Sequence, residues 1–210
     1  MAFLIPVIFF WLALLFAAVL WWRFRKRGNS IAELIEDERA ANDTRKRSLE
    51  EELFYSPDLS VLPFHDNAGD ALLAVQDNVR ACAGRKMIRF GKPMKNIELK
   101  RAYGVGNLEA IAQYEENYHR YCRSLISWSE GLIANGFDKD GMDVLEETVR
   151  LGSEYKKSFT LLADRYAAAG DTCKLDTLLK QLDSIYFMDN NSKNAINSYI
   201  NKKKAEASQQ

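Results

Sequence analysis

Histidine and cysteine, which often hold metals or act as nucleophiles, are few and scattered in this sequence. Neither His65 nor His119 lies near a set of Cys, Asp or Glu residues at metal-ligand spacing. The three cysteines form no C-x-x-C pair and lie far apart, at Cys82, Cys122 and Cys173. Isolated cysteines in odd number are typical of reduced, buried thiols rather than of a disulfide frame or a zinc site. We therefore predict no catalytic residue, no metal site and no cofactor.

Two other patterns could bind a ligand, but each has a simpler structural explanation. Asp138-x-Asp140-Gly-x-Asp143 resembles part of a calcium loop, yet it lacks the terminal glutamate and the full loop length, which favours helix capping. Five aromatic residues at helical spacing could form a ligand cage, although such residues are mostly core: Tyr103, Tyr114, Tyr118, Tyr121 and Trp128. No G-x-S-x-G, H-E-x-x-H or P-loop pattern occurs, so the sequence does not indicate an enzyme.

The strongest local charge is a basic block of Arg85, Lys86, Arg89, Lys92, Lys95, Lys100 and Arg101. Acidic segments precede and follow the basic block, so pairing within the chain is one explanation for it. The block could otherwise bind an acidic partner or, in an enzyme or enzyme subunit, an anionic ligand. Nucleic acid fits less well, because few aromatic residues stand among the cations for base stacking. The whole chain is neutral, with 29 basic and 29 acidic side chains, which also argues against nucleic-acid binding.

The composition sets the size and class of the protein. A chain of 210 residues that is 47% hydrophobic and 28% charged has room for one or two small domains. Its 11 Gly, 4 Pro and 3 Cys exclude the collagen-like, low-complexity and disulfide-stapled classes.

Residues 1–22 carry no charged side chain and are mostly Leu, Ile, Phe, Val and Ala. About 20 helical residues cover the hydrocarbon core of a bilayer, so this segment is long enough for a transmembrane anchor. A cleaved signal peptide, which needs basic residues before its apolar run, and a buried core helix are the alternatives. Here the basic residues follow the apolar run, from Arg23 to Arg27. The positive-inside rule then predicts a single-pass protein that contacts the membrane through residues 3–22, with its N-terminus outside and its C-terminal domain in the cytoplasm.

Helical periodicity dominates the rest of the chain. A charged stalk helix should start at Ile31 and run toward Phe54, with a possible break near Asn42. Apolar spacing predicts a helix over 69–83, a short one over 97–103, and a long one over 107–134 that is either continuous or bent near His119. Further helices are expected at about 138–151, 154–169, 171–186 and 189–203.

The segment from Cys122 onward matches itself at a shift of 34 residues. The matched pairs are Leu125 with Phe159, Trp128 with Leu162, Ser129 with Ala163, Leu132 with Tyr166 and Gly136 with Gly170. The two residues of each pair are similar in size or, for the glycines, suit the same backbone conformation. A small residue is needed where two antiparallel helices cross closely, large apolar residues flank it, and glycine suits the point where the chain reverses. These residues are predicted to form the packing contacts of two repeats.

This pattern resembles the tetratricopeptide repeat (TPR) family. The first helix and turn of that motif are matched by Phe159-Thr-Leu-Leu-Ala-Asp-Arg-Tyr-Ala-Ala-Ala-Gly-Asp171, and Leu125 to Gly136 is a looser copy. Gly141 and Leu175 replace the usual alanine of the second helix, and no proline closes either repeat. Because two copies are fewer than stable arrays normally need, the helices at 69–103 and 189–203 would have to cap the stack.

The resemblance implies a helical scaffold whose first helices line a groove for a peptide or protein segment. The groove positions, carried over one by one, are Arg123, Ile126, Glu130 and Ile133 in the first repeat and Lys157, Thr160, Asp164 and Ala167 in the second. Glu130 and Asp164 stand where a clamp for a terminal carboxylate would need neutral donors, so that clamp is not matched. The alternative is that the charged positions form exposed ion pairs of little energy.

The sequence thus predicts an all-α chain in five parts: a transmembrane anchor at 1–22, a stalk and linker at 23–66, an N-terminal helical part at 67–121, two TPR-like repeats at 122–188, and a capping helix with a polar tail at 189–210. The predicted function is a membrane-anchored cytoplasmic scaffold that binds a peptide or protein and no nucleic acid. The alternatives are an enzyme or enzyme subunit that uses the basic block, and a structural membrane component that self-associates into a homo-oligomer.

Overall fold

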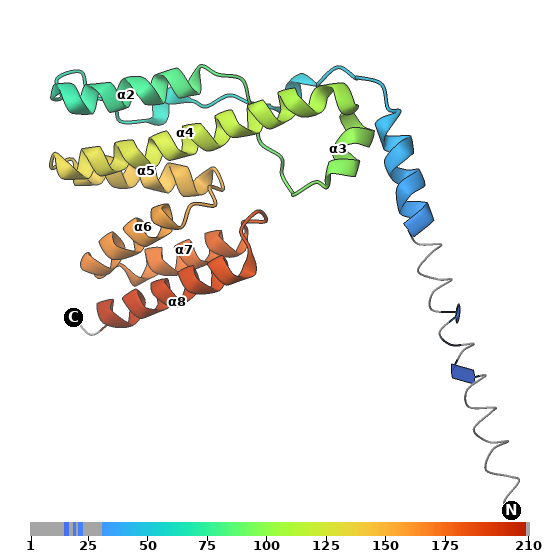
Figure 1. Ribbon diagram of the computed structural model, residues 1–210. Coiled ribbons are helices and arrows are strands. Elements are labelled where there is room, and N and C mark those ends of the chain that lie inside the picture. The colour runs from blue at the N-terminus through green and yellow to red at the C-terminus, as the bar shows by residue number, and fades with distance from the viewer. Residues whose placement is uncertain (1–14, 17–18, 20, 23–30, 209–210) are drawn as a thin grey trace, which may run out of the picture. The chain divides into compact units, whose positions relative to one another are not determined.

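The computed structural model describes residues 15–16, 19, 21–22 and 31–208. The fold is mostly helical (72%), which confirms the predicted all-α character (Figure 1). In chain order the helices are α2 (Asp70–Ala83), α3 (Asn96–Tyr103), α4 (Leu108–Ala134), α5 (Asp138–Arg150), α6 (Lys156–Ala168), α7 (Thr172–Asp183) and α8 (Asn190–Ala207). They lie close to the helices expected from apolar periodicity, and α4 is continuous through His119.

The structure contradicts the expectation of a transmembrane helix. Within the parts of the chain that the structure describes, no helix combines the length and the apolar composition needed to cross a bilayer. Most of the predicted anchor, residues 1–22, lies outside the described residues. The fold class is therefore corrected to a mostly helical fold without a described transmembrane helix. The predicted single-pass localisation, with the N-terminus outside and the C-terminal domain in the cytoplasm, is corrected with it.

The chain divides into two compact units, and each is described by itself. The first unit comprises Met1–Ser48 and Lys95–Leu108, and the second comprises Leu49–Met94 and Glu109–Gln210. In the first unit, residues 31–42 are helical, and this segment pairs with α3 through acidic and basic side chains. Asp37 lies 2.7 Å from Arg101, and Glu38 pairs with Lys100. Two of the seven cations of the basic block are therefore neutralised within the chain.

The stalk helix ends at residue 42, at the possible break near Asn42, and does not continue toward Phe54. Its apolar stripe is thin, so little packing favours a longer helix. The chain after it is extended and bonds to the end of α3. The backbone N–H of Arg47 donates to the carbonyl oxygen of Tyr103 at 3.1 Å, and the side-chain amide of Asn107 donates to the carbonyl oxygen of Arg47 at 2.5 Å. These long-range backbone bonds replace the bonds that a longer helix would have made.

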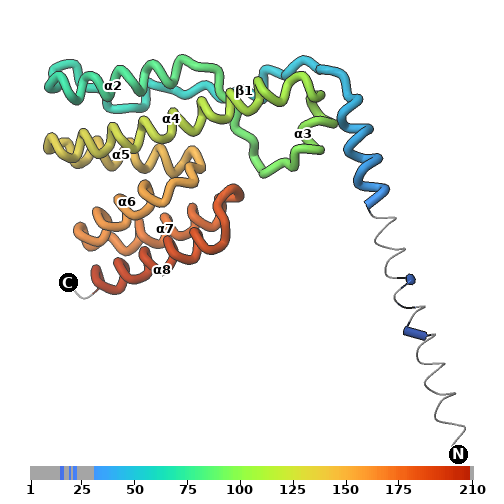
Figure 2. The backbone as a smooth tube through the Cα atoms, in the orientation of Figure 1, coloured from blue at the N-terminus to red at the C-terminus, as the bar shows by residue number. Residues whose placement is uncertain are grey.

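The second unit begins with a short antiparallel ribbon that the sequence analysis did not predict. Strand β1 (Phe54–Tyr55) pairs with β2 (Met87–Ile88), so that Phe54 lies opposite Ile88 and Tyr55 opposite Met87. Helix α2 lies between the two strands in the chain and packs against α4. Beyond them, α5, α6, α7 and α8 follow one another in the stack (Figures 1 and 2).

Two helical hairpins of the second unit, α4–α5 and α6–α7, have the same turn. Gly136 and Gly170, 34 residues apart, have φ angles of 84° and 68°, a left-handed conformation that glycine adopts without a Cβ clash. In the first turn the N–H of Phe137 donates to Leu132 O at 3.0 Å. In the second, the N–H of Asp171 donates to Tyr166 O at 2.9 Å. These bonds to the carbonyl oxygens of the preceding helix end both helices in the same way.

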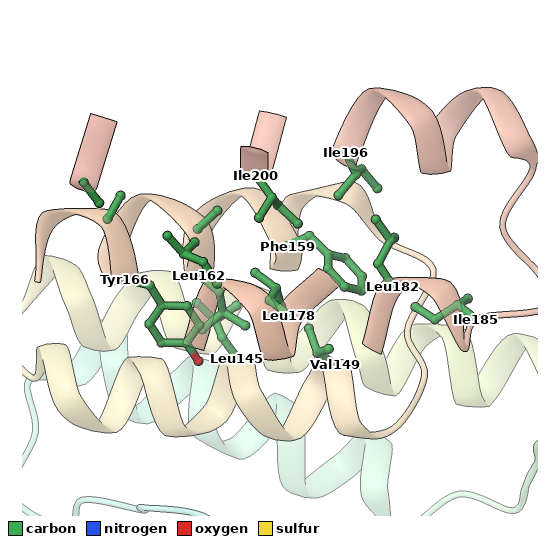
Figure 3. Close-up of a cluster of buried hydrophobic side chains, with 14 of the residues drawn as sticks. Leu145, Val149, Phe159, Leu162, Tyr166, Leu178, Leu182, Ile185, Ile196 and Ile200 are labelled. Carbon is green, nitrogen blue, oxygen red and sulfur yellow. The ribbon is translucent and has the colours of Figure 1, made fainter. Parts of the chain in front are cut away.

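The hydrophobic core of the second unit consists of two clusters. One joins α2, α4 and the ribbon, and its largest fully buried side chain is Trp128. The other joins α5, α6, α7 and α8 around Phe159, which Figure 3 shows beside Leu178, Leu182 and Ile196. All the non-glycine residues predicted for repeat packing are buried: Leu125, Trp128, Ser129, Leu132, Phe159, Leu162, Ala163 and Tyr166.

Helices α4 and α5 approach each other closely at Gly141, which faces Ser129. A Cβ atom added to Gly141 would lie 2.9 Å from the carbonyl oxygen of Ser129 and 2.6 Å from Cγ1 of Ile133. The helices can therefore meet this closely only because position 141 carries no side chain. In the second hairpin, Leu175 fills the equivalent position and is fully buried.

We expect Gly141→Ala to lower the free energy of unfolding by about 1 kcal/mol or more. Overpacking costs up to about 3 kcal/mol, and the clash with the backbone oxygen of Ser129 makes the cost here larger than the gain of about 1 kcal/mol that alanine normally gives inside a helix. Urea unfolding of the full chain measures the change. Gly131→Ala in α4 is the control, since its added Cβ would meet only the flexible end of Leu72, at 3.2 Å. Equal stabilisation by both substitutions would show that the α4–α5 crossing is not tight.

Candidate functional site

The predicted groove residues lie along α4 and α6, and their charged members form pairs from helix to helix. Glu130 of α4 lies 2.6 Å from Lys157 of α6. Asp164 of α6 lies 3.2 Å from Lys203 of α8 and accepts a hydrogen bond from the Tyr199 hydroxyl at 2.7 Å. One face of the helical stack therefore carries charged pairs that connect α4 to α6 and α6 to α8.

The other predicted groove residues contribute less to that face. Ile126 and Ala167 are only 5% and 7% exposed, so both belong to the packed interior rather than to an open surface. Ile133 packs at the edge of the cluster around Phe159. The Thr160 hydroxyl donates to the carbonyl oxygen of Lys157 at 3.1 Å. Arg123, the remaining position, is held by the side chains of Glu116 and Tyr155, at 2.7 and 2.8 Å.

A cavity of about 220 Å³ lies entirely within the second unit. Its wall comes from four segments: residues 88–91 at and after β2, positions 115–122 of α4, the α5–α6 connection and the α7–α8 connection. Tyr186 and Phe187 line it from the α7–α8 connection and are 72% and 41% exposed. Two neighbouring exposed aromatic side chains therefore form part of the cavity wall.

Two groups of the cavity wall that could act as nucleophiles or proton donors are held in their protonated forms. Burial raises the pKa of the Cys122 thiol to about 12, against the lowering effect of Tyr118 and Arg89. Burial also raises the pKa of the Tyr118 hydroxyl, which donates to the carbonyl oxygen of Leu151 at 2.5 Å. A thiol that stays protonated is a poor nucleophile.

An acidic pair flanks His119 on the same wall. Glu154 lies 3.7 Å from Nδ1 of His119. Burial raises the pKa of Glu115, while the nearby His119 acts in the opposite direction. Glu115 forms no ion pair or hydrogen bond with any side chain among the described residues. Its carboxylate is thus partly desolvated without a bonded partner.

Arg89 is the member of the basic block that lines the cavity. Its guanidinium lies over Gly152, where an added Cβ would be only 2.6 Å from a terminal nitrogen of Arg89. Arg89 forms no ion pair or hydrogen bond with the rest of the described chain. The basic block as a whole does not converge here, because Lys100 and Arg101 are paired in the first unit.

The remaining candidates from the sequence have structural surroundings. Nε2 of His65 lies 2.8 Å from Asp140, and its ring is 4.3 Å from the Phe137 ring, so this histidine fastens the loop before α2 to α5. Gln76 is fully buried and bonds to both the N–H and the carbonyl oxygen of His65. No cluster of potential metal ligands occurs among the residues that the structure describes.

The aromatic residues considered as a ligand cage and the three cysteines also have structural surroundings. Tyr121 and Trp128 are 1% and 0% exposed and belong to the core, whereas Tyr118 reaches the cavity. Cys82 and Cys122 are free and buried, in line with the expected inert thiols, but Cys173 is exposed on α7.

The cavity was not predictable from the sequence, because its wall combines four segments that are distant in the chain. Two dipeptides in the sequence contribute to the wall. Arg89-Phe90 combines a cation with an aromatic residue, and Tyr186-Phe187 is an aromatic pair that is exposed in the structure. Neither dipeptide indicates a site until the fold brings the two together.

Comparison with known proteins identifies no relative: no protein family, no curated protein and no solved structure matches this chain.

Proposed function

We propose that this protein is an interaction scaffold built from TPR-like helical hairpins, and that it binds a peptide or protein segment across α4, α6 and α8. The observation that carries the proposal is the succession of charged pairs on this face, Glu130 with Lys157 and Asp164 with Lys203. The repeated spacing of the hairpins supports the TPR-like assignment, since α6 and α8 begin 34 residues apart, as do α5 and α7.

The charged side chains on this face can leave their ion-pair partners within the chain and pair with a ligand instead. The side chains of Lys157 and Glu130 are 57% and 40% exposed, and exposed ion pairs contribute only about 0–1 kcal/mol each. Packed helices lie about 8–10 Å apart, and an extended segment rises about 3.3 Å per residue. About every third residue of a bound extended segment can therefore contact the next helix.

The alternatives have less support from the contacts. An enzyme that binds an anionic substrate through the basic block would need those cations to converge, yet Lys100 and Arg101 pair with Glu38 and Asp37. Self-association would use a second copy as the partner. Sedimentation of the full chain over a range of concentrations separates that alternative from a monomeric scaffold.

Selection of a random peptide library against the full chain tests the proposal. The exchange variant Glu130→Lys/Lys157→Glu keeps an ion pair between α4 and α6 but reverses the order of charge on the face. We expect selected peptides to bind this variant about tenfold more weakly, a loss of about 1.4 kcal/mol in binding free energy. Fluorescence anisotropy of labelled peptides measures the affinity.

Lys139→Glu is the matched control, because Lys139 is exposed on α5 and outside the face. Thermal melting of the three proteins verifies that each remains folded. The proposal is wrong if no peptide is enriched, or if the enriched peptides bind the exchange variant as tightly as they bind Lys139→Glu.

A further inference from the structure

The cavity beside α4 has a charge arrangement that the proposed scaffold function does not use. None of the predicted groove residues lines it. Four formally charged side chains do, and two of these are matched nearby. Arg150 forms two hydrogen bonds with Glu147, both at 2.6 Å, and Glu154 lies beside His119.

Arg89 and Glu115 are the two charged groups of the cavity that form no ion pair or hydrogen bond among the described residues, although His119 lies near enough to Glu115 to lower the pKa of its carboxyl group. They do not pair with each other. Glu115 is half-buried, and this burial raises the pKa of its carboxyl group. A half-buried charge such as that of Glu115 is costly unless it is paired, so it gains from a group of opposite charge. Arg89 is exposed and offers its guanidinium at the cavity wall.

The rest of the wall combines apolar and aromatic residues with the polar side chains of His119, Ser153, Gln181 and Ser184. Ile88, Val149 and Ile185 are 1%, 3% and 4% exposed and supply apolar surface, while Phe90 and Tyr118 add aromatic surface. The volume of about 220 Å³ exceeds the roughly 150 Å³ of an engineered cavity that holds benzene. An apolar side chain containing one ring therefore fits the space.

We propose that this cavity binds a small zwitterion with an apolar side chain, of the α-amino acid class. Arg89 takes the carboxylate, for which the planar guanidinium offers two parallel N–H donors. Glu115 takes the ammonium group. The side chain of the ligand lies among the apolar residues of the wall, and Tyr186 and Phe187 flank it from the α7–α8 connection.

Gly152 has a specific part in this arrangement. It has a φ of 75° and leaves the space in which the guanidinium of Arg89 lies. A side chain at position 152 would displace that group from the cavity wall. The glycine thus leaves room for the Arg89 side chain at the cavity wall, where it can meet a carboxylate.

Calorimetric titration of the full chain with L-phenylalanine tests the proposal, with two blocked analogues as comparisons. N-acetyl-L-phenylalanine keeps only the carboxylate, and L-phenylalaninamide keeps only the ammonium group. We expect the zwitterion to bind at least tenfold more tightly than either analogue. Arg89→Gln and Glu115→Gln should each weaken the binding of L-phenylalanine about tenfold.

The dipeptide L-phenylalanyl-L-leucine separates two sources of the same chemistry. Binding of the dipeptide alone assigns the cavity to short peptides, and binding of the free amino acid assigns it to amino acids. Lys92→Gln and Glu109→Gln are the controls, because both residues are exposed charges outside the cavity wall. They should leave the affinity unchanged.

Three results would overturn the inference: no binding of either zwitterion at millimolar concentration, equal binding of the blocked analogues, or unchanged affinity in both Arg89→Gln and Glu115→Gln. The proposal does not depend on the scaffold function. Peptides selected on the α4–α6–α8 face should bind Arg89→Gln as they bind the parent, so the two proposals can fail separately.

Discussion

Replacement of Phe159 by alanine lowers the free energy of unfolding by about 3–5 kcal/mol, the usual cost of removing a buried aromatic side chain from a packed core. Phe159 is fully buried, and its ring lies where α6 meets α7 and α8 (Figure 3). The loss has two parts, the transfer of the ring to water and the cavity left behind, which neighbouring leucines and isoleucines fill only in part. A domain stability of about 5–15 kcal/mol leaves little margin for such a loss.

Urea unfolding, followed by circular dichroism of the full chain, measures this effect. Tyr186→Ala is the matched control, because Tyr186 is 72% exposed and its removal should change the free energy of unfolding by no more than about 0.5 kcal/mol. If Phe159→Ala fell within about 1 kcal/mol of the parent, the packing of α6 against α7 and α8 would be wrong.

The second large effect is a loss of stability at alkaline pH. Burial raises the pKa of Tyr55 and of Cys122 to about 12, from 10.0 and 9.0, and raises those of Tyr118 and Tyr121 as well. The unfolded chain releases these protons at lower pH than the folded chain. Between about pH 9 and pH 12 the unfolded state therefore binds fewer protons, and the free energy of unfolding falls as the pH rises. Below about pH 9 these groups leave stability unchanged.

Each such group contributes a slope of up to about 1.4 kcal/mol per pH unit. Urea unfolding at intervals across the alkaline range gives the slope for the parent and for Cys122→Ala. We expect a shallower slope in the variant, whatever its stability at neutral pH, because one buried acid is gone. Cys173→Ala serves for comparison, since that side chain is exposed on α7. Identical slopes in the parent and Cys122→Ala would disprove the buried thiol's part in the effect.

The helices were predictable because their core positions recur at helical spacing. The apolar stripe of α4 runs unbroken from Ile111 to Leu132, and the glycines at 136 and 170 mark the two turns. The ribbon was not predictable, since strands β1 and β2 are two residues long and pair across more than thirty residues of chain. So short a strand has no periodicity to detect.

The site was less predictable than the fold, for a different physical reason. The family resemblance identified groove positions on α4 and α6 only by their place in the repeat motif. That place does not tell which of these positions the next helix covers. Ile126 and Ala167 are therefore buried although the resemblance placed them in a groove. The cavity depends on connections between helices, where the sequence carries no repeating pattern. The apolar N-terminal segment was assigned from hydropathy alone, and the described part of the chain contains no membrane-spanning helix.

Helix α5 stands between the two hydrophobic clusters, and neighbouring residues of its chain serve opposite sides. Val144 belongs to the cluster around Trp128, whereas Leu145 belongs to the cluster around Phe159. If either cluster opened, one side of α5 would be exposed to solvent. Amide hydrogens in the middle of α5 should consequently exchange with solvent only when both halves come apart, which makes this helix the slowest-exchanging part of the second unit.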